Sequence, residues 1–202
     1  MSAANRSIDE YLKKTHQTMS RMDLSDAKRL SDYLFEAWRQ RRFIFVFGNG
    51  GSGATASHFA EDLGKNALRE ADLADDTKKR PRVMSLTDNT SWITALANDI
   101  GYEHVFVQQL VQYAQPGDVV LAISGSGNSP NVVTAVNWAK RRGLLTFGLT
   151  GYDGGRLRQI QQDGLHVPIH DMGIVESVHL TVLHWVVDDI HARINSRVPQ
   201  PA

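Results

Sequence analysis

Histidine and carboxylate side chains occur at helical spacing in two distant parts of this sequence. His58 and Asp62 are four residues apart, so on a helix they share one face a single turn apart. Glu176 and His184 are eight residues apart on a second predicted helix, about two turns and about 80° round. Such groups can bind a divalent metal or exchange protons near neutral pH. Taken singly, each histidine is more often a structural side chain, and the spacing leaves both interpretations open.

Two glycine- and serine-rich stretches follow apolar runs. Residues 48–52, "GNGGS", come after "FIFVF", and residues 124–129, "SGSGNS", come after "DVVLAI". Glycine lets backbone N–H groups approach an anion, serine hydroxyls donate further hydrogen bonds, and a following helix N-terminus is favourable to negative charge. Either stretch alone is equally explained as a tight strand-to-helix turn. Two of them in one small domain favour a phosphorylated ligand.

Two other phosphate-binding motifs are disfavoured. The sequence contains no G-x-x-x-x-G-K-[ST], which excludes a P-loop nucleotide site. Gly48, Gly50 and Gly53 match G-x-G-x-x-G formally, but a dinucleotide site also needs an acid at the end of the second strand, about 20 residues further on. Here that region is the polar segment 65–81. This segment is either a mobile flap or a plain surface connection.

Strand-like and helix-like segments alternate along the chain. The apolar runs are nearly continuous, as in parallel strands buried on both faces. The predicted strands are 43–47, 82–87, 118–123, 144–150 and 165–169, and the predicted helices are 8–20, 25–41, 52–64, 90–99, 102–114, 129–142, 154–162 and 173–196. We therefore expect one α/β domain over 1–202, with a doubly wound parallel sheet of about five strands flanked by helices. Its parts are an N-terminal helical segment 1–41, a core 42–170 and a C-terminal helix from about 173 to 196.

Composition narrows the range of partners. The 22 basic and 22 acidic residues balance, which offers no electrostatic footprint for nucleic acid or an anionic membrane surface. The absence of cysteine excludes disulfides and thiolate chemistry and is compatible with a cytoplasmic location. No signal peptide or membrane span is expected, because no stretch approaches 18 apolar residues.

Four stretches together resemble a known family. They are "FGNGGSGATASHFAEDL", "LTDNTSWITALANDIGYEHVFVQQL", "GDVVLAISGSGNSPNVVTAVNWAKRRGLLTFGLTGYDGG" and "VESVHLTVLHWVVDDI". In this order they resemble the sugar isomerase (SIS) domain and, within it, the phosphoheptose isomerases. The resemblance runs from about residue 8 to 196, and it is more specific for the domain than for the reaction.

The resemblance implies a metal site at His58, Asp62, Glu176 and His184, with Zn²⁺ as the expected ion. Asp62 stands where the family has Glu and is one methylene shorter, and Glu176 replaces a Gln. Glu61 turning inward is an alternative to Asp62, although it lies about 100° away on the helix. Two histidines with two carboxylates are still a suitable donor set for zinc. Catalytic competence is less secure than metal binding, because a carboxylate misplaced by about 1 Å can cost about 100-fold in rate.

The implied reaction is an aldose–ketose isomerisation of sedoheptulose 7-phosphate through an enediol, feeding nucleotide-heptose and surface-glycan synthesis. Asp62 would be the base and His184 the partner acid. The implied substrate and phosphate contacts are Asn49, Gly50, Gly51, Ser52, Asp88, Ser124, Gly125, Ser126 and Ser129, with Lys65 replacing a family Arg that aligns with Asn66. Gly125 stands where the family usually has Thr. Asp88 also suits the N-cap of the helix at about 90.

The resemblance leaves two other functions open. One is a non-catalytic SIS protein that binds macromolecules, as the replication-initiator-associating relatives do, and the other is a sugar-phosphate sensor with a slow site. The isomerases are tetramers with sites at subunit interfaces, so a homotetramer is expected here. Tyr33 and Trp38 would suit packing between subunits or within one subunit.

Overall fold

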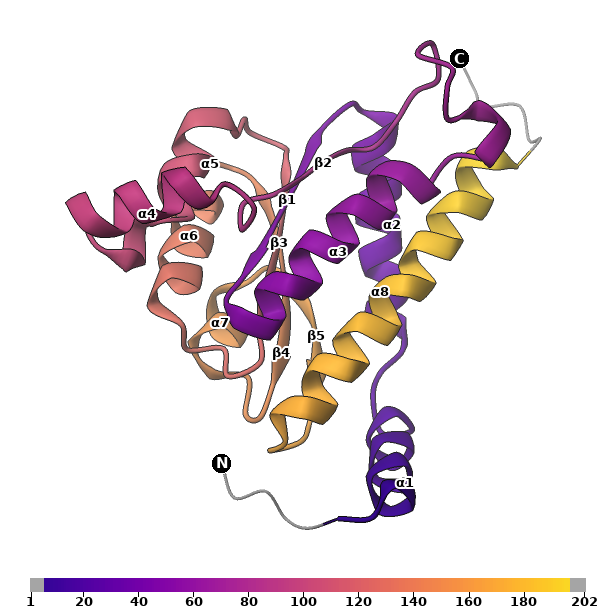
Figure 1. The fold of residues 1–202 in the computed structure, drawn as a ribbon, viewed down its shortest axis with the longest axis vertical. Helices are drawn as coiled ribbons and strands as arrows, with labels where there is room; N and C mark the ends of the chain where they lie inside the picture. The colour runs from indigo at the N-terminus through magenta and orange to yellow at the C-terminus, as the bar shows by residue number, and fades with distance from the viewer. Residues whose placement is uncertain (1–5, 197–202) are drawn as a thin grey trace.

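The structure is a computed structural model that describes residues 6–196, and it is built around a single parallel sheet (Figure 1). The strand order is β2-β1-β3-β4-β5, and all four pairings are parallel. The strands are β1 (Phe43–Gly48), β2 (Arg82–Ser85), β3 (Val119–Ser124), β4 (Leu145–Gly151) and β5 (Asp163–Val167). This arrangement confirms the predicted doubly wound α/β fold.

Alternate residues of the central strands face two separate hydrophobic cores. In β1, Ile44 and Val46 belong to one buried cluster, while Phe45 and Phe47 belong to the other. Both faces of the sheet are therefore apolar, which is why these strands read as continuous hydrophobic runs.

Helices cover both faces of the sheet (Figure 1). One face carries α2, α3 and α8, and the other carries α5, α6 and α7. The helices are α1 (Ile8–Met19), α2 (Ser25–Arg39), α3 (Gly50–Asn66), α4 (Thr90–Asp99), α5 (Val107–Tyr113), α6 (Pro130–Arg141), α7 (Gly155–Ile160) and α8 (Met172–Asn195), with short 3-10 turns η1 (Glu70–Asp72) and η2 (Tyr102–His104). Helix α1 extends away from the body of the molecule (Figure 1).

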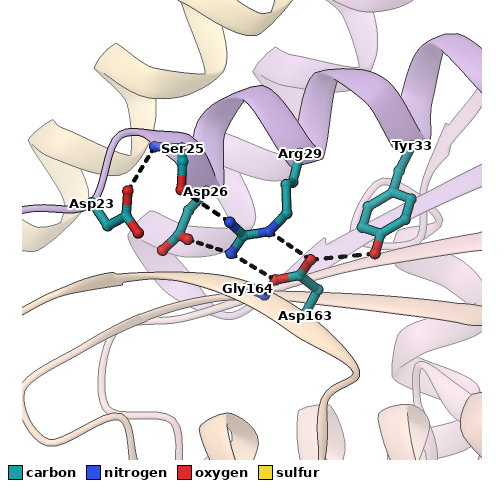
Figure 2. Close-up of polar contacts among 7 residues, drawn as sticks. All are labelled: Asp23, Ser25, Asp26, Arg29, Tyr33, Asp163 and Gly164. Carbon is teal, nitrogen blue, oxygen red and sulfur yellow. Dashed lines mark hydrogen bonds and ion pairs between the residues drawn. The ribbon is translucent and has the colours of Figure 1, made fainter.

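An ionic cluster links α2 to β5, which is an edge strand of the sheet (Figure 2). Arg29 Nε donates to Asp163 Oδ2 at 2.9 Å, and the hydroxyl of Tyr33 donates to the same oxygen at 3.3 Å. Burial opposes ionisation of Asp163, but the hydrogen bonds from Arg29, the Gly164 N–H and Tyr33 outweigh it, so its pKa is lowered. The Tyr33 ring also packs edge-on against Phe147, and Trp38 is buried. Packing within one subunit therefore accounts for Tyr33 and Trp38.

Several predicted boundaries were wrong for identifiable reasons. Strand β5 spans Asp163–Val167 rather than 165–169, because Pro168 has no N–H to continue the ladder. The helix predicted over 102–114 is divided into η2 and α5. Helix α3 begins two residues before the predicted position 52, inside the glycine-rich stretch. Gly50 and Gly51 of this stretch are therefore helical, which places the backbone N–H groups of the loop at a helix start.

The polar segment 65–81 lies against the body as a surface connection. Trp38 Nε1 donates to the Lys79 carbonyl at 3.2 Å, and Lys79 Nζ donates to the Arg39 carbonyl at 2.8 Å. At its other end, Asn195 Nδ2 donates to the Ala67 carbonyl at 3.0 Å. Within residues 6–196, no helix combines the length and apolar character needed to cross a membrane.

Candidate active site

Helices α3 and α8 lie side by side and run in the same direction (Figure 1). Near their starts, Glu176 of α8 lies over Gly51 of α3. Near their ends, His191 Nδ1 is 2.7 Å from the carbonyl oxygen of Asn66. The histidine and acid pairs seen in the sequence therefore face each other across one helix pair.

Three of the predicted metal ligands meet between these helices. His58 Nε2 is 3.1 Å from Asp62 Oδ2, and His184 Nε2 is 3.7 Å from the same oxygen. The two imidazole rings are edge to face, with centroids 5.1 Å apart. Both histidine side chains are about half exposed, whereas that of Asp62 is 15% exposed. Solvent or a ligand can thus reach the cluster from the histidine side.

The cluster suits a small divalent cation. One donor atom from each of the three residues lies within 4.8 Å of the others. Zinc is held at about 2.0–2.2 Å by imidazole nitrogen and carboxylate oxygen, so one ion fits among donors this close together. Two histidines and one acid are also a ligand set found in catalytic zinc sites, which keep a further position open for water or substrate.

Glu176 lies apart from this cluster. A β-carbon on Gly51 would be 2.6 Å from the Glu176 carboxyl carbon, so that carboxylate fills the space that glycine leaves at the start of α3. Its assignment as a fourth ligand stays a prediction, since it requires the side chain to leave this position.

The second oxygen of Asp62 is held by a residue that the sequence analysis did not assign a role. Asn66 Nδ2 donates to Asp62 Oδ1 at 2.8 Å, one turn further along α3. The i, i+4 spacing was the available signal for this pair. Glu61 does not turn inward but is exposed and pairs with Lys65 at 3.2 Å. Lys65 and Asp62 both line a cavity of about 640 Å³ that continues toward residues 68–73.

The first glycine-rich loop begins α3 without a side-chain cap. Asn49 occupies the N-cap position, but its side chain makes no capping hydrogen bond. Gly50 adopts φ +54°, a conformation that favours glycine. Ser52 is buried in the first turn. The first backbone N–H groups of a helix have no acceptor within the helix, so those of Gly50, Gly51 and Ser52 suit an anion.

The second loop shows the same arrangement at α6. Ser129 is at the N-cap position without a side-chain cap, and its hydroxyl instead accepts from Ser124 Oγ at 3.4 Å. The Ser126 hydroxyl accepts from the Asn128 N–H at 3.3 Å. A β-carbon on Gly125 would collide with the sulfur of Met172, so a larger residue here would require the Met172 side chain to move.

Asp88 contacts the helix that carries the cluster. Its carboxylate accepts a hydrogen bond from the hydroxyl of Ser57, the residue before His58. The N-cap of α4 is Asn89, whose side chain accepts from the Trp92 N–H at 3.3 Å, so the capping role considered for Asp88 was wrong. The contact of Asp88 with a sugar hydroxyl stays a prediction.

A buried histidine links α8 to the sheet. His179 is 1% exposed, and its Nε2 lies 3.2 Å from the Thr150 carbonyl oxygen, to which it donates. Burial lowers the pKa of His179 to about 4, so the ring is neutral at physiological pH. The Thr150 hydroxyl is 3.1 Å from His166 Nδ1, and burial, aided by the charge of Arg158, lowers the pKa of His166.

Comparison with known proteins identifies the family. The SIS domain family matches residues 10–151. A probable phosphoheptose isomerase of Thermoplasma acidophilum is 36% identical over 177 residues, which are 88% of this chain and 93% of the relative. The phosphoheptose isomerase of Pelobacter propionicus is 42% identical over 156 residues, which are 77% and 78%. The structure of phosphoheptose isomerase GmhA from Neisseria gonorrhoeae superposes with a TM-score of 0.82 at 27% identity, covering 92% of this chain and 97% of that one. The chain therefore belongs to the phosphoheptose isomerase family of SIS-domain proteins.

Proposed function

We propose that this protein is an aldose–ketose isomerase that converts sedoheptulose 7-phosphate into glycero-manno-heptose 7-phosphate for nucleotide-heptose and surface-glycan synthesis. The observation that carries the proposal is the meeting of His58, Asp62 and His184 beside a helix whose N-terminus is a glycine-rich loop. The relatives named above as phosphoheptose isomerases support the choice of substrate.

In this proposal, two loops bind the phosphate, and the acid–base cluster acts on the carbonyl end of the sugar. The N–H groups of Gly51 and Ser52 and the hydroxyls of Ser124, Ser126 and Ser129 hold the phosphate. Asn49, Asp88 and Lys65 are the proposed contacts to the rest of the substrate. The carbonyl end of the sugar then lies toward the cluster.

In the reaction, a carboxylate removes the proton from the carbon beside the carbonyl. Asp62 is the proposed base, taking a C1 proton from the ketose to give an enediol and returning it to C2. His184, whose Nε2 is 3.7 Å from Asp62 Oδ2, moves the proton from O1 to O2. Asn66 holds the other Asp62 oxygen and so limits rotation of the carboxylate.

His58, Asp62 and His184 are the residues that would hold a divalent metal, and we propose Zn²⁺, with Glu176 as a fourth ligand if its side chain moves. When bound, such an ion polarises the substrate carbonyl. The two imidazoles would hold it through neutral ring nitrogens, so metal binding would weaken at acid pH.

We also propose that the enzyme is cytoplasmic and homotetrameric, with its sites at subunit interfaces. Exposed large apolar side chains support assembly: Ile8, Leu12, Leu24 and Trp185 are 68%, 57%, 56% and 41% exposed, and Leu24 and Trp185 line one apolar groove. Light scattering coupled to size-exclusion chromatography measures the subunit number, and a monomeric mass at micromolar concentration would contradict this part of the proposal.

Deuterium incorporation tests the reaction directly. The purified protein, with and without Zn²⁺, is incubated with sedoheptulose 7-phosphate in ²H₂O, and labelling at C1 and C2 is followed by NMR. We expect labelling in the wild type and its loss in Asp62→Asn and His184→Ala, while His16→Ala on the exposed face of α1 is the histidine control. Binding of the sugar phosphate without labelling would favour a sensor. Loss in His184→Ala alone would refute Asp62 as the base.

A further inference from the structure

Asn49 precedes α3 at the position where asparagine normally caps a helix. Asparagine is among the preferred N-cap residues because its Oδ1 accepts from the N–H of the second or third helical residue. Here those residues are Gly51 and Ser52, and no such bond forms. Some other contact must therefore hold the Asn49 amide.

That contact is a reciprocal amide pair with Asn131. Asn49 Nδ2 donates to Asn131 Oδ1 at 2.9 Å, and Asn131 Nδ2 donates to Asn49 Oδ1 at 2.8 Å. The Tyr102 hydroxyl donates to the same Asn49 oxygen at 3.1 Å. A carbonyl oxygen has two lone pairs, so these two donors occupy the acceptor that would otherwise cap α3.

Asn131 is itself firmly placed. It is 1% exposed, and its Oδ1 also accepts from the Val132 N–H at 2.9 Å. It lies in the first turn of α6, directly after the second serine-rich loop, whereas Asn49 belongs to the first loop. The pair therefore joins the two loops to which the phosphate is assigned.

We propose that Asn131 is a positioning residue that keeps Asn49 from capping α3, so that the first N–H groups of that helix remain free for the phosphate. The inference rests on the proposed function in taking a sugar phosphate as the ligand. Without Asn131, the Asn49 side chain is free to rotate onto the N–H of Gly51 or Ser52 and compete with the anion. Asn131 acts through Asn49 and needs no contact with the substrate.

The affinity for inorganic phosphate, measured by calorimetry on the full chain, tests this role. Asn131→Ala should weaken binding about fivefold, the strength of a typical N-cap hydrogen bond that phosphate must displace. Tyr102→Phe, at an exposed position that leaves the core intact, should weaken it less and in the same direction. Asn137→Ala, elsewhere on α6, and Tyr113→Phe are the matched controls and should keep the wild-type affinity. Unchanged affinity in Asn131→Ala would overturn the inference.

A double variant separates positioning from direct contact. Asn49→Ala combined with Asn131→Ala removes the competing side chain, so phosphate affinity should return to within about twofold of the wild type. A further loss in the double variant would overturn the inference, because Asn49 would then contact phosphate itself. If these affinities behave as expected but the wild type does not isomerise sedoheptulose 7-phosphate, the proposed reaction is refuted and the role of Asn131 stands. If the wild type isomerises the sugar normally but Asn131→Ala keeps the wild-type phosphate affinity, the role of Asn131 is refuted and the proposed reaction stands.

Discussion

His179 should make the stability of this protein depend on pH between 6.5 and about 4, a window that begins above the range in which carboxylates titrate. In the folded chain it is 1% exposed and burial lowers its pKa to about 4, against 6.5 for the ordinary group. The unfolded chain therefore binds a proton at this residue as pH falls below 6.5, whereas the folded chain does not. Because the unfolded state binds more protons in this window, stability is fully present above pH 6.5 and declines toward pH 4.

The two pKa values set the size of the effect. The difference between 6.5 and about 4, at about 1.4 kcal/mol for each pH unit, amounts to about 3 kcal/mol, most of which is lost by pH 4.5. This is a large fraction of the free energy of unfolding of a typical domain, about 5–15 kcal/mol. His166, whose pKa is also lowered by burial, adds a loss of the same sign.

Urea unfolding of the metal-free protein at several pH values between 7 and 4.5 measures this loss, and His179→Gln isolates the contribution of one residue. Glutamine retains an N–H donor for the Thr150 carbonyl but has no proton to gain. The variant should lose about 2–3 kcal/mol less than the wild type over this range. His16→Gln, on the exposed face of α1, controls for the change of residue type. Equal losses in the wild type and His179→Gln would refute the idea that a buried neutral imidazole is responsible.

Three further predictions concern the helix pair and its cluster. Gly53→Ala should destabilise the protein by about 1–3 kcal/mol in urea unfolding, because its β-carbon would lie 2.9 Å from the Gly48 backbone oxygen, whereas Gly64→Ala in the same helix should stabilise it by up to about 1 kcal/mol; equal effects would contradict this. Asn66→Ala should lower kcat about tenfold with little change in KM, since it frees the Asp62 carboxylate to rotate; a change confined to KM would argue against orientation. Treatment with a chelator should abolish deuterium incorporation, with recovery on adding Zn²⁺, and full activity in the chelated enzyme would count against a catalytic metal.

Much of the sheet was predictable because burial on both faces leaves continuous apolar runs. The β1 and β3 runs needed no tertiary information, since nearly all of their residues are buried. Strand β5 was displaced in the prediction because its first residue, Asp163, is an acid that reads as a loop. Its place in the strand depends on Arg29, which lies 134 residues away in sequence.

In the candidate site too, contacts within one helix were predictable from the sequence, whereas contacts between distant segments were not. His58 and Asp62 were predictable as neighbours because helical spacing alone brings them together. The pairing of Asn49 with Asn131 was not, because it spans 82 residues and arises only when β1 and β3 become adjacent in the sheet. The position of Glu176 over Gly51 likewise depends on how two helices pack, which the pattern of either helix does not contain.

Helix α3 is unbroken, so it fixes the distance between the proposed phosphate contact and the histidine–aspartate cluster. One unbroken helix carries both the proposed phosphate contact Ser52 and the cluster residue His58, so their axial separation is about 9 Å at 1.5 Å per residue. No hinge along that helix adjusts the interval. A sugar phosphate with too short a carbon chain, anchored by its phosphate, would leave its carbonyl short of the cluster. On the proposed assignments, selection by chain length would follow from helix geometry itself, and changing it would require a residue inserted into or removed from the helix rather than a new side chain.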